Sequence, residues 1–297
     1  MVPHLEFVLA LLLLAILGFL SPTVTNRARS GLQSRPALLF AVPAVLTLLF
    51  SGLAVAADAF SVPLALLVLV YTFAPVALAF FQGPGGRPAR SRWLDFVIIL
   101  MLWLPLEFSA GQHLIPKPAQ GFLHSVAYGI AILLGLTIFL GFRALPGMKF
   151  NLPSARDLAY GAAAFLACAP ILIAGGRLLG FIPPFHAPAH PSAGAIGRTF
   201  GVIFVGTALP EEILFRSLIQ NWLMQSFGFT SRMLFVSAFI FGCAHLDNGP
   251  QPLPNWRYMI LATIAGLAYG KAFQKSSSVF SSVTCHALVD ATKHIFF

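Results

Sequence analysis

The sequence predicts an all-α membrane protein, a polytopic bundle of eight to ten transmembrane helices. Three observations support this fold class. Hydrophobic residues make up 58% of the 297 residues and charged residues only 9%, whereas a soluble domain carries about 25% charged residues. Apolar runs of the length that spans a bilayer, about 17–25 residues, recur along the chain. The links between these runs hold most of the proline, glycine and basic residues.

Ten apolar windows are candidate spans. They cover residues 5–23, 37–56, 60–81, 94–108, 122–142, 157–175, 199–225, 231–246, 258–273 and 279–296. The fourth and eighth windows are short for a bilayer crossing and could be tilted or re-entrant segments. The predicted number of spans is therefore eight to ten.

The net charge of +9 does not indicate a nucleic-acid surface, because the basic residues lie in the short links. Basic residues in such links orient a membrane protein and contact anionic lipid. The links after the odd-numbered spans carry most of them, which predicts that these links are cytoplasmic and that the N-terminus is outside. We expect a multi-pass protein of a bacterial or archaeal cytoplasmic membrane, with lipid as a partner and no nucleic acid.

Two links are long. Residues 82–92 form a glycine- and proline-rich cytoplasmic connector, and residues 181–192 form an outer loop that could lie on the membrane or act as a lid. His186 and His190 lie in that loop, where a plain loop and a metal site are the alternatives. The three cysteines lie in apolar segments, which predicts no disulfide framework.

The most informative charges are Glu211, Glu212 and Arg216, which lie in an apolar stretch of a chain with only nine acidic residues. A charged side chain at the centre of a membrane costs about 2.5–3.5 kcal/mol on insertion scales. Pro210 precedes the glutamates and predicts that a helix starts or kinks there, with both glutamates in its first turn.

On a helix, Glu212 and Arg216 share a face and can neutralise each other. Glu211 points roughly 100° away, because an α-helix has 3.6 residues per turn. Glu211 is therefore predicted to face a cavity and to be free to titrate. The alternative is a buried ion cluster that only holds helices together.

Two further polar groups lie in late apolar windows. Phe241 and His245 are one helical turn apart, and His286 and Asp290 are four residues apart. Each group could instead be an interfacial residue or a polar pair that joins helices. Counted at 1.5 Å per residue, Glu211 and His245 lie roughly 20 Å from the cytoplasmic helix ends and His286 roughly 14 Å. These side chains can therefore meet at one depth.

The order Glu-Glu-x-x-x-Arg, Phe-x-x-x-His and His-x-x-x-Asn/Asp resembles the CAAX-processing and bacteriocin-immunity (CPBP, Abi) family of intramembrane proteases. The resemblance covers the last hundred residues, so 196–297 is predicted to be the protease core and 1–195 an N-terminal transmembrane bundle of unknown role. It implies hydrolysis of a peptide bond in a membrane-embedded or lipidated protein or peptide.

The resemblance also implies roles for these residues. Glu211 and His245 would activate a water molecule, and His286 with residue 290 would stabilise the oxyanion. Glu212, Arg216 and Phe241 would support the site. The family commonly has asparagine where this chain has Asp290.

Asp290 can donate a hydrogen bond to an oxyanion only when it is protonated. We expect this neutral form, because the carboxyl has no evident ion-pair partner and both Lys293 and His294 can extend to the outer surface. The alternative is an ionised Asp290 that orients His286.

Glu211, His245 and His286 would be the ligands if the site held a catalytic zinc. We expect no metal, because a carboxylate and a buried imidazole can themselves act as general base. Cys243 and Cys285 are more consistent with packing than with metal binding, since Cys243 lies about 200° around the helix from His245.

Two other functions remain open. A proton-coupled transporter also requires buried acidic residues and histidines, but the polar residues here lie in the last third of the chain and no internal repeat is evident. A non-catalytic membrane scaffold would tolerate replacement of Glu211.

Overall fold

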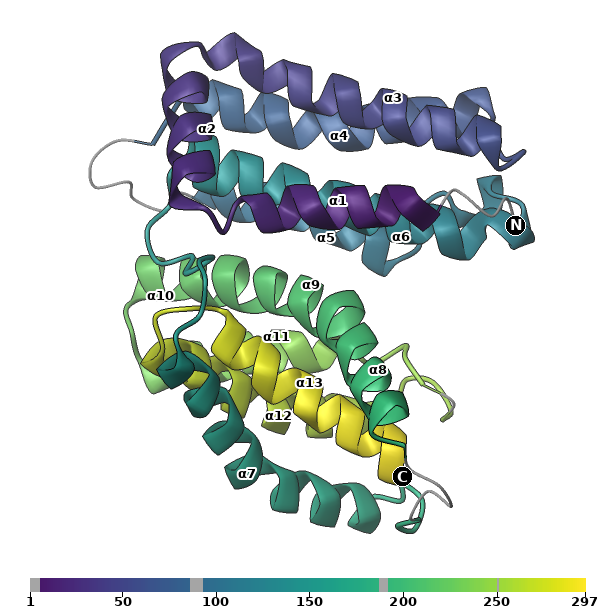
Figure 1. The fold of residues 1–297 in the computed structure, drawn as a ribbon, viewed down its shortest axis with the longest axis vertical. Coiled ribbons are helices and arrows are strands. Elements are labelled where there is room, and N and C mark those ends of the chain that lie inside the picture. The colour runs from purple at the N-terminus through teal and green to yellow at the C-terminus, as the bar shows by residue number, and fades with distance from the viewer. Residues whose placement is uncertain (1–5, 86–92, 187–191, 250) are drawn as a thin grey trace. The chain divides into compact units, whose positions relative to one another are not determined.

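The structure, a computed structural model, describes residues 6–85, 93–186, 192–249 and 251–297 (Figure 1). Every regular element in these ranges is a helix, which confirms the all-α prediction. The chain forms two compact units, Met1–Pro146 and Gly147–Phe297. Residues 86–92 of the predicted connector, and His190, lie outside the described residues.

The first unit consists of long apolar helices joined by short turns. Its elements are α1 (Glu6–Gly18), α2 (Pro22–Ser34), η1 (Pro36–Phe40), α3 (Ala41–Ala56), α4 (Val62–Gln82), α5 (Trp93–Glu107), η2 (Gln112–Leu114), α6 (Lys117–Leu136) and the π-helical η3 (Thr137–Phe142). Helix α6 packs against α1, α3 and α5, while α4 lies between α3 and α5. This packing buries apolar side chains of α6 such as Leu123 and Ile130.

A buried ion pair joins α5 to the end of η3. The Arg143 guanidinium donates from Nε and Nη2 to the two carboxylate oxygens of Asp95, at 3.0 and 3.2 Å. It also donates from Nη1 to the carbonyl of Gly83 at 2.7 Å. Arg143 lies in one of the basic links, yet its charge is satisfied inside the bundle.

The second unit holds all the candidate site residues. Its elements are α7 (Ala155–Leu178), α8 (Ala193–Ile203), η4 (Phe204–Ala208), α9 (Leu209–Glu212), η5 (Ile213–Gln220), α10 (Asn221–Phe227), α11 (Ser231–Cys243), α12 (Trp256–Lys275) and α13 (Phe280–Phe296). Helix α12 packs against α7, α11 and α13. It therefore forms the centre of the unit.

Close packing of α11 on α12 depends on Gly242, which lies three residues before the predicted site residue His245. A Cβ at Gly242 would overlap the hydroxyl of Thr263 and lie 2.6 Å from the carbonyl of Met259. Only a residue without a side chain allows this approach, which holds the end of α11, and thus His245, against α12.

Polar contacts fix the other end of α12 and the turn into α13. The Lys149 ammonium donates to the carbonyls of Phe273 and Ser276, at 2.6 and 2.7 Å. Burial lowers the pKa of Lys149, and the nearby Asp157 opposes that shift. Asp157 also accepts hydrogen bonds from the backbone and hydroxyl of Ser277. These contacts tie the start of α7 to the α12–α13 turn.

The two compact units divide at residues 146 and 147, whereas the division predicted from the sequence lies at residue 195. Helix α7 was assigned to the N-terminal region by sequence, but it packs on α12 and α13. The reason is steric: Gly161 of α7 lies directly against the backbone of Ser281, with no room for a Cβ. The segment 196–297, which was predicted to be the protease core, thus packs against the helix that precedes it.

All ten predicted windows coincide with helical structure, but the number of spans is not confirmed. Among the residues that the structure describes, four helices are long and apolar enough to cross a membrane: Pro36–Ala56, Val62–Gln82, Lys117–Phe142 and Ala155–Leu178. A fifth is obtained if Phe7–Gly18 and Pro22–Ser34, which meet at 84°, count as one broken span. These apolar helices indicate that the protein is an integral membrane protein.

Replacing Asp95 by Asn should destabilise the first unit. The change leaves the buried Arg143 charge without a counterion, which costs about 3–5 kcal/mol in unfolding free energy. Reversible denaturation in mixed micelles measures the loss. The control is Asp58→Asn, because Asp58 is exposed in a turn with a positive φ that asparagine tolerates. Equal stability of the two variants would contradict the prediction.

Candidate active site

Both glutamates lie inside a long irregular helix and not at its start. The backbone stays helical from Ala193 to Phe227, with π-helical segments immediately before and after α9. Figure 1 shows α8, α9 and α10 following one another as a bent rod. The prediction that a helix starts or kinks at Pro210 is met in part: α9 begins at Leu209 and holds both glutamates in its first turn, but the backbone before it is already helical. π-helical turns lie on both sides of the segment that contains the proline, so the helix continues past it. Such turns are frequent at functional sites.

Glu212 is completely buried and pairs with Arg216, as predicted. The Arg216 Nε donates to Glu212 Oε2 at 2.8 Å, and both side chains are 0% exposed. Beyond this bond, the guanidinium lies over the rings of Phe241 and Tyr269, with its carbon 4.9 and 5.7 Å from their centroids. Cation–π attraction strengthens when the cation is desolvated, so these rings stabilise the arginine in the absence of water.

The second oxygen of Glu212 binds His286. His286 Nδ1 lies 2.9 Å from Glu212 Oε1. An ionised carboxylate can only accept a hydrogen bond, so Nδ1 carries the proton and donates it. Sequence reasoning assigned Glu212 only to Arg216 and missed this contact, which joins segments 74 residues apart.

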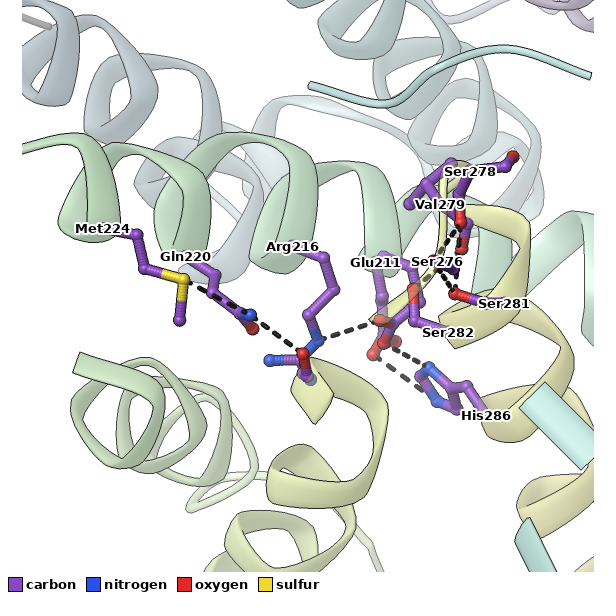
Figure 2. A network of polar contacts seen from close by, with 12 residues as sticks. Glu211, Arg216, Gln220, Met224, Ser276, Ser278, Val279, Ser281, Ser282 and His286 are labelled. Carbon is purple, nitrogen blue, oxygen red and sulfur yellow. Dashed lines mark hydrogen bonds and ion pairs between the residues drawn. The ribbon is translucent and has the colours of Figure 1, made fainter. Parts of the chain in front are cut away.

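The other nitrogen of His286 faces two more carboxylates. His286 Nε2 is 3.4 Å from Asp290 Oδ2 and 3.9 Å from Glu211 Oε2. Figure 2 shows Glu211 and Arg216 projecting from one helix, with Glu211 extending toward His286 on another. The structure thus brings three acidic side chains around one imidazole. Glu211 and Asp290 are about 30% exposed, while His286 is 3% exposed.

His245 is held in one tautomer by the backbone. Its Nδ1 lies 2.8 Å from the carbonyl of Phe241, and a carbonyl can only accept, so Nδ1 is the protonated nitrogen. In the neutral ring, Nε2 then carries the lone pair and can accept a proton or a hydrogen bond. His245 is 8% exposed and lies at the end of α11.

Aromatic rings connect the two histidines. Phe241, 2% exposed, contacts the His245 ring at a centroid distance of 4.7 Å and the His286 ring at 5.7 Å. Tyr269 stacks nearly parallel on His286 at 4.6 Å, and Tyr258 meets His245 edge to face, also at 4.6 Å. These contacts fix the plane of each imidazole.

Both histidines and Asp290 line a cleft in the second unit. Most of its other lining residues are apolar, from α7, α11, α12 and α13. Tyr258 and Tyr269 also line it, with Ala262 and Ala265 between them. The spacing of these four residues places them on one face of α12. The same spacing is visible in the sequence and could have identified this face of the cleft.

The expectation that Asp290 lacks an ion-pair partner is wrong. His286 lies within ion-pair distance of it, and Lys293, which was expected to extend to the outer surface, lines the same cleft. Positions 286, 290 and 293 share one face of α13, because they are four and three residues apart. That face is turned into the cleft.

The alternative metal sites gain no support from the arrangement of the side chains. Within the described ranges, no three His, Cys, Asp or Glu side chains converge closely enough to hold a metal ion. This applies to Glu211, His245 and His286 and to the exposed His186, so we derive no step through zinc. All three cysteines are free, and Cys168 and Cys285 are buried, in agreement with a packing role.

The fold and the site define an all-helical membrane protein with a buried Glu–Arg–His–Asp cluster beside an apolar cleft. Residues 196–292 match the family model described as type II CAAX prenyl endopeptidase Rce1-like. The match confirms the resemblance to the CAAX-processing proteases and supports a CAAX-protease-like enzyme, a membrane-bound hydrolase. No significant match was found among the curated proteins or the solved structures.

Glu212→Gln should lower the free energy of unfolding by more than the loss of a single ion pair would, because Glu212 has two partners. The change leaves Arg216 without its counterion and weakens the bond to His286, so we expect a loss of about 3–5 kcal/mol in unfolding free energy. Denaturation in mixed micelles measures it. Asp247→Asn, at an exposed acid near His245, is the matched control. A Glu212→Gln protein as stable as this control would show that the pair contributes nothing.

Proposed function

We propose that this protein is an intramembrane endopeptidase of glutamic type, which hydrolyses a peptide bond in a membrane-embedded or lipidated protein or peptide. The observation that carries the proposal is the convergence of Glu211 and Asp290 on Nε2 of His286. His286, Asp290 and His245 line one apolar cleft. Charged groups in such surroundings are costly. Their grouping beside a cleft favours chemistry over helix packing.

In the proposed reaction, a water molecule donates its hydrogens to Glu211 and to the lone pair of His245 Nε2. This leaves an oxygen lone pair for attack on the scissile carbonyl carbon, and Glu211 takes the proton as general base. The same proton then passes from Glu211 to the leaving nitrogen as the carbon–nitrogen bond breaks. The products are a new carboxylic acid, which then ionises, and a new amine, which takes up a proton.

His286 supplies the oxyanion donor in this scheme. Its Nδ1 proton is committed to Glu212, so an additional proton on Nε2 makes the ring an imidazolium, which the surrounding carboxylates stabilise. At 3.4 Å the contact from Nε2 to Asp290 is long for a hydrogen bond. The Nε2–H therefore retains capacity to donate to the developing oxyanion.

The proposal includes the cellular setting. Apolar helices in both units favour a multi-pass protein with eight to ten spans, in which the shorter helices of the second unit also lie within the bilayer. A bacterial or archaeal cytoplasmic membrane fits the basic links. Prenylated proteins are the substrate class of the matched family, and a lipid-modified chain would enter an apolar cleft from the membrane.

Glu211→Gln should abolish proteolysis in a folded protein, with a fall of about 10²–10⁴-fold in kcat, because the amide cannot accept the proton of the water. The assay is cleavage of a prenylated fluorogenic peptide by full-length protein in detergent. Asp247→Asn should keep parental activity. A scaffold or transporter would show no cleavage that depends on Glu211, and an active Glu211→Gln enzyme would refute the assignment.

The Asp290→Asn variant distinguishes two alternative roles of Asp290: an ionised carboxylate that orients His286 and a neutral acid that donates to the oxyanion. Because the structure gives this carboxyl an imidazole partner, we expect the ionised form to orient His286. The amide should then lower kcat/KM by about 10²-fold throughout the active pH range, since the orienting charge is lost. A pH–rate profile of variant and parent is the measurement. Retained activity that extends to higher pH would instead identify a neutral Asp290 as the oxyanion donor.

A further inference from the structure

A groove runs between α7 and α12 on other faces of these helices than those that line the cleft. Its lining residues come from α7 and α12, with Leu234 of α11. Cys168, Leu234 and Ala272, which are buried, line it together with more exposed residues. Among the described residues, the groove and the cleft share no lining residue. The groove is therefore separate from the candidate active site.

The walls of the groove have the length of one bilayer leaflet. The α7 wall runs from Tyr160 to Ile171, and the α12 wall runs from Lys275 back to Ile264. The start of α7 is hydrogen-bonded to the turn after α12, so Tyr160 and Lys275 lie at the same end. At 1.5 Å per residue each wall is about 16 Å long, and half of the hydrocarbon core of a bilayer is about 15 Å thick. One acyl chain therefore matches the length of the groove.

Helix α7 turns little of its surface toward the protein. It is one of the described helices that are long and apolar enough to cross a membrane, and only 11% of its apolar window is buried. Figure 1 shows α7 along the edge of the second unit. Ala163 and Ala167, which line the groove, are exposed. An open apolar wall on a membrane-spanning helix is covered by lipid chains.

One end of the groove carries positive charge. Lys271 and Lys275 line it and are exposed. At the same end, Arg156 donates to the hydroxyl of Tyr160 at 2.9 Å. Within the described ranges, the ion pairs shorter than 4 Å include none of these three cations. Asp157, next to Arg156 in the chain, is buried and accepts hydrogen bonds from serines on either side of this end. The three cations thus remain available to an anion.

We propose that this groove binds one anionic phospholipid of the surrounding membrane, with its phosphate at Lys271 and Lys275 and one acyl chain along the walls. A basic end on an apolar groove between helices matches an anionic headgroup on an acyl chain. A zwitterionic headgroup fits less well, because its own cation is repelled by the lysines. The links that hold Arg156 and Lys275 are both predicted to be cytoplasmic, so the lipid belongs to the cytoplasmic leaflet. The inference does not depend on the proposed peptidase function.

The test uses phosphatidylglycerol with a photoreactive diazirine on one acyl chain, added to full-length protein in detergent. After irradiation, mass spectrometry of peptides maps the label. Label should concentrate on residues 160–171 and 264–275. Unlabelled phosphatidylglycerol should displace it at a concentration about 10- to 30-fold lower than phosphatidylcholine with the same acyl chains, as expected for two lysines near a headgroup. Label spread evenly over the apolar helices, or equal displacement by the two lipids, would overturn the inference.

A double variant, Lys271→Gln with Lys275→Gln, tests the headgroup contact. It should remove the advantage of phosphatidylglycerol over phosphatidylcholine as competitor and reduce labelling of the groove about 10-fold. The matched control is Arg27→Gln with Arg232→Gln, which removes the same charge from two exposed cations that do not line the groove. This control should label as the parent does. An unchanged preference in the lysine variant would refute the proposed phosphate contact.

A third variant, Ala167→Trp, tests the acyl chain separately, because an indole at this exposed position occupies the groove without removing a charge. Labelling of the groove should fall, whereas Ala159→Trp, at another exposed alanine of α7 that does not line the groove, should leave it unchanged. Equal labelling of the two variants would contradict the placement of the chain. The last competitor is a prenylated peptide without phosphate. Displacement as effective as that by phosphatidylglycerol would show that the groove holds a prenyl chain instead, and would overturn the inference.

Discussion

The carboxylate of Glu212 is the constraint on which the rest of the site depends. It is fully buried and binds Arg216 with one oxygen and His286 with the other. Arg216 lies over Phe241 and Tyr269, and both of these rings contact His286. The contacts therefore close a ring through α9, η5, α11, α12 and α13. A charge that water cannot reach is stable only with such partners, so packing of these five segments also forms the site.

The irregular helix around Pro210 gives the two adjacent glutamates different environments. Proline cannot donate a backbone hydrogen bond, and π-helical segments lie on both sides of it. Glu212 is completely enclosed, whereas Glu211 remains 29% exposed and lies near Nε2 of His286. One carboxylate is thus a structural counterion and the other can exchange protons.

The cleft gives this polar cluster an apolar setting. Ala262 and Ala265 leave space between Tyr258 and Tyr269 on the face of α12 that lines it. Apolar walls limit water, which strengthens hydrogen bonds and ion pairs at the site. The same walls would accommodate an apolar substrate. A polar cluster beside an apolar cleft therefore fits the proposed hydrolysis of an apolar substrate.

The sequence by itself determined the all-helical class, the positions of the long apolar helices and the pairing of Glu212 with Arg216, because apolar runs and the i, i+4 spacing are local properties of a chain. It could not determine that His286 shares Glu212, nor that Lys293 is turned into the cleft, since these depend on how distant helices pack. Nor could it place α7 with the later helices, a result of the close fit of Gly161 against α13. Local chemistry selected the residues, and tertiary packing decided which of them meet.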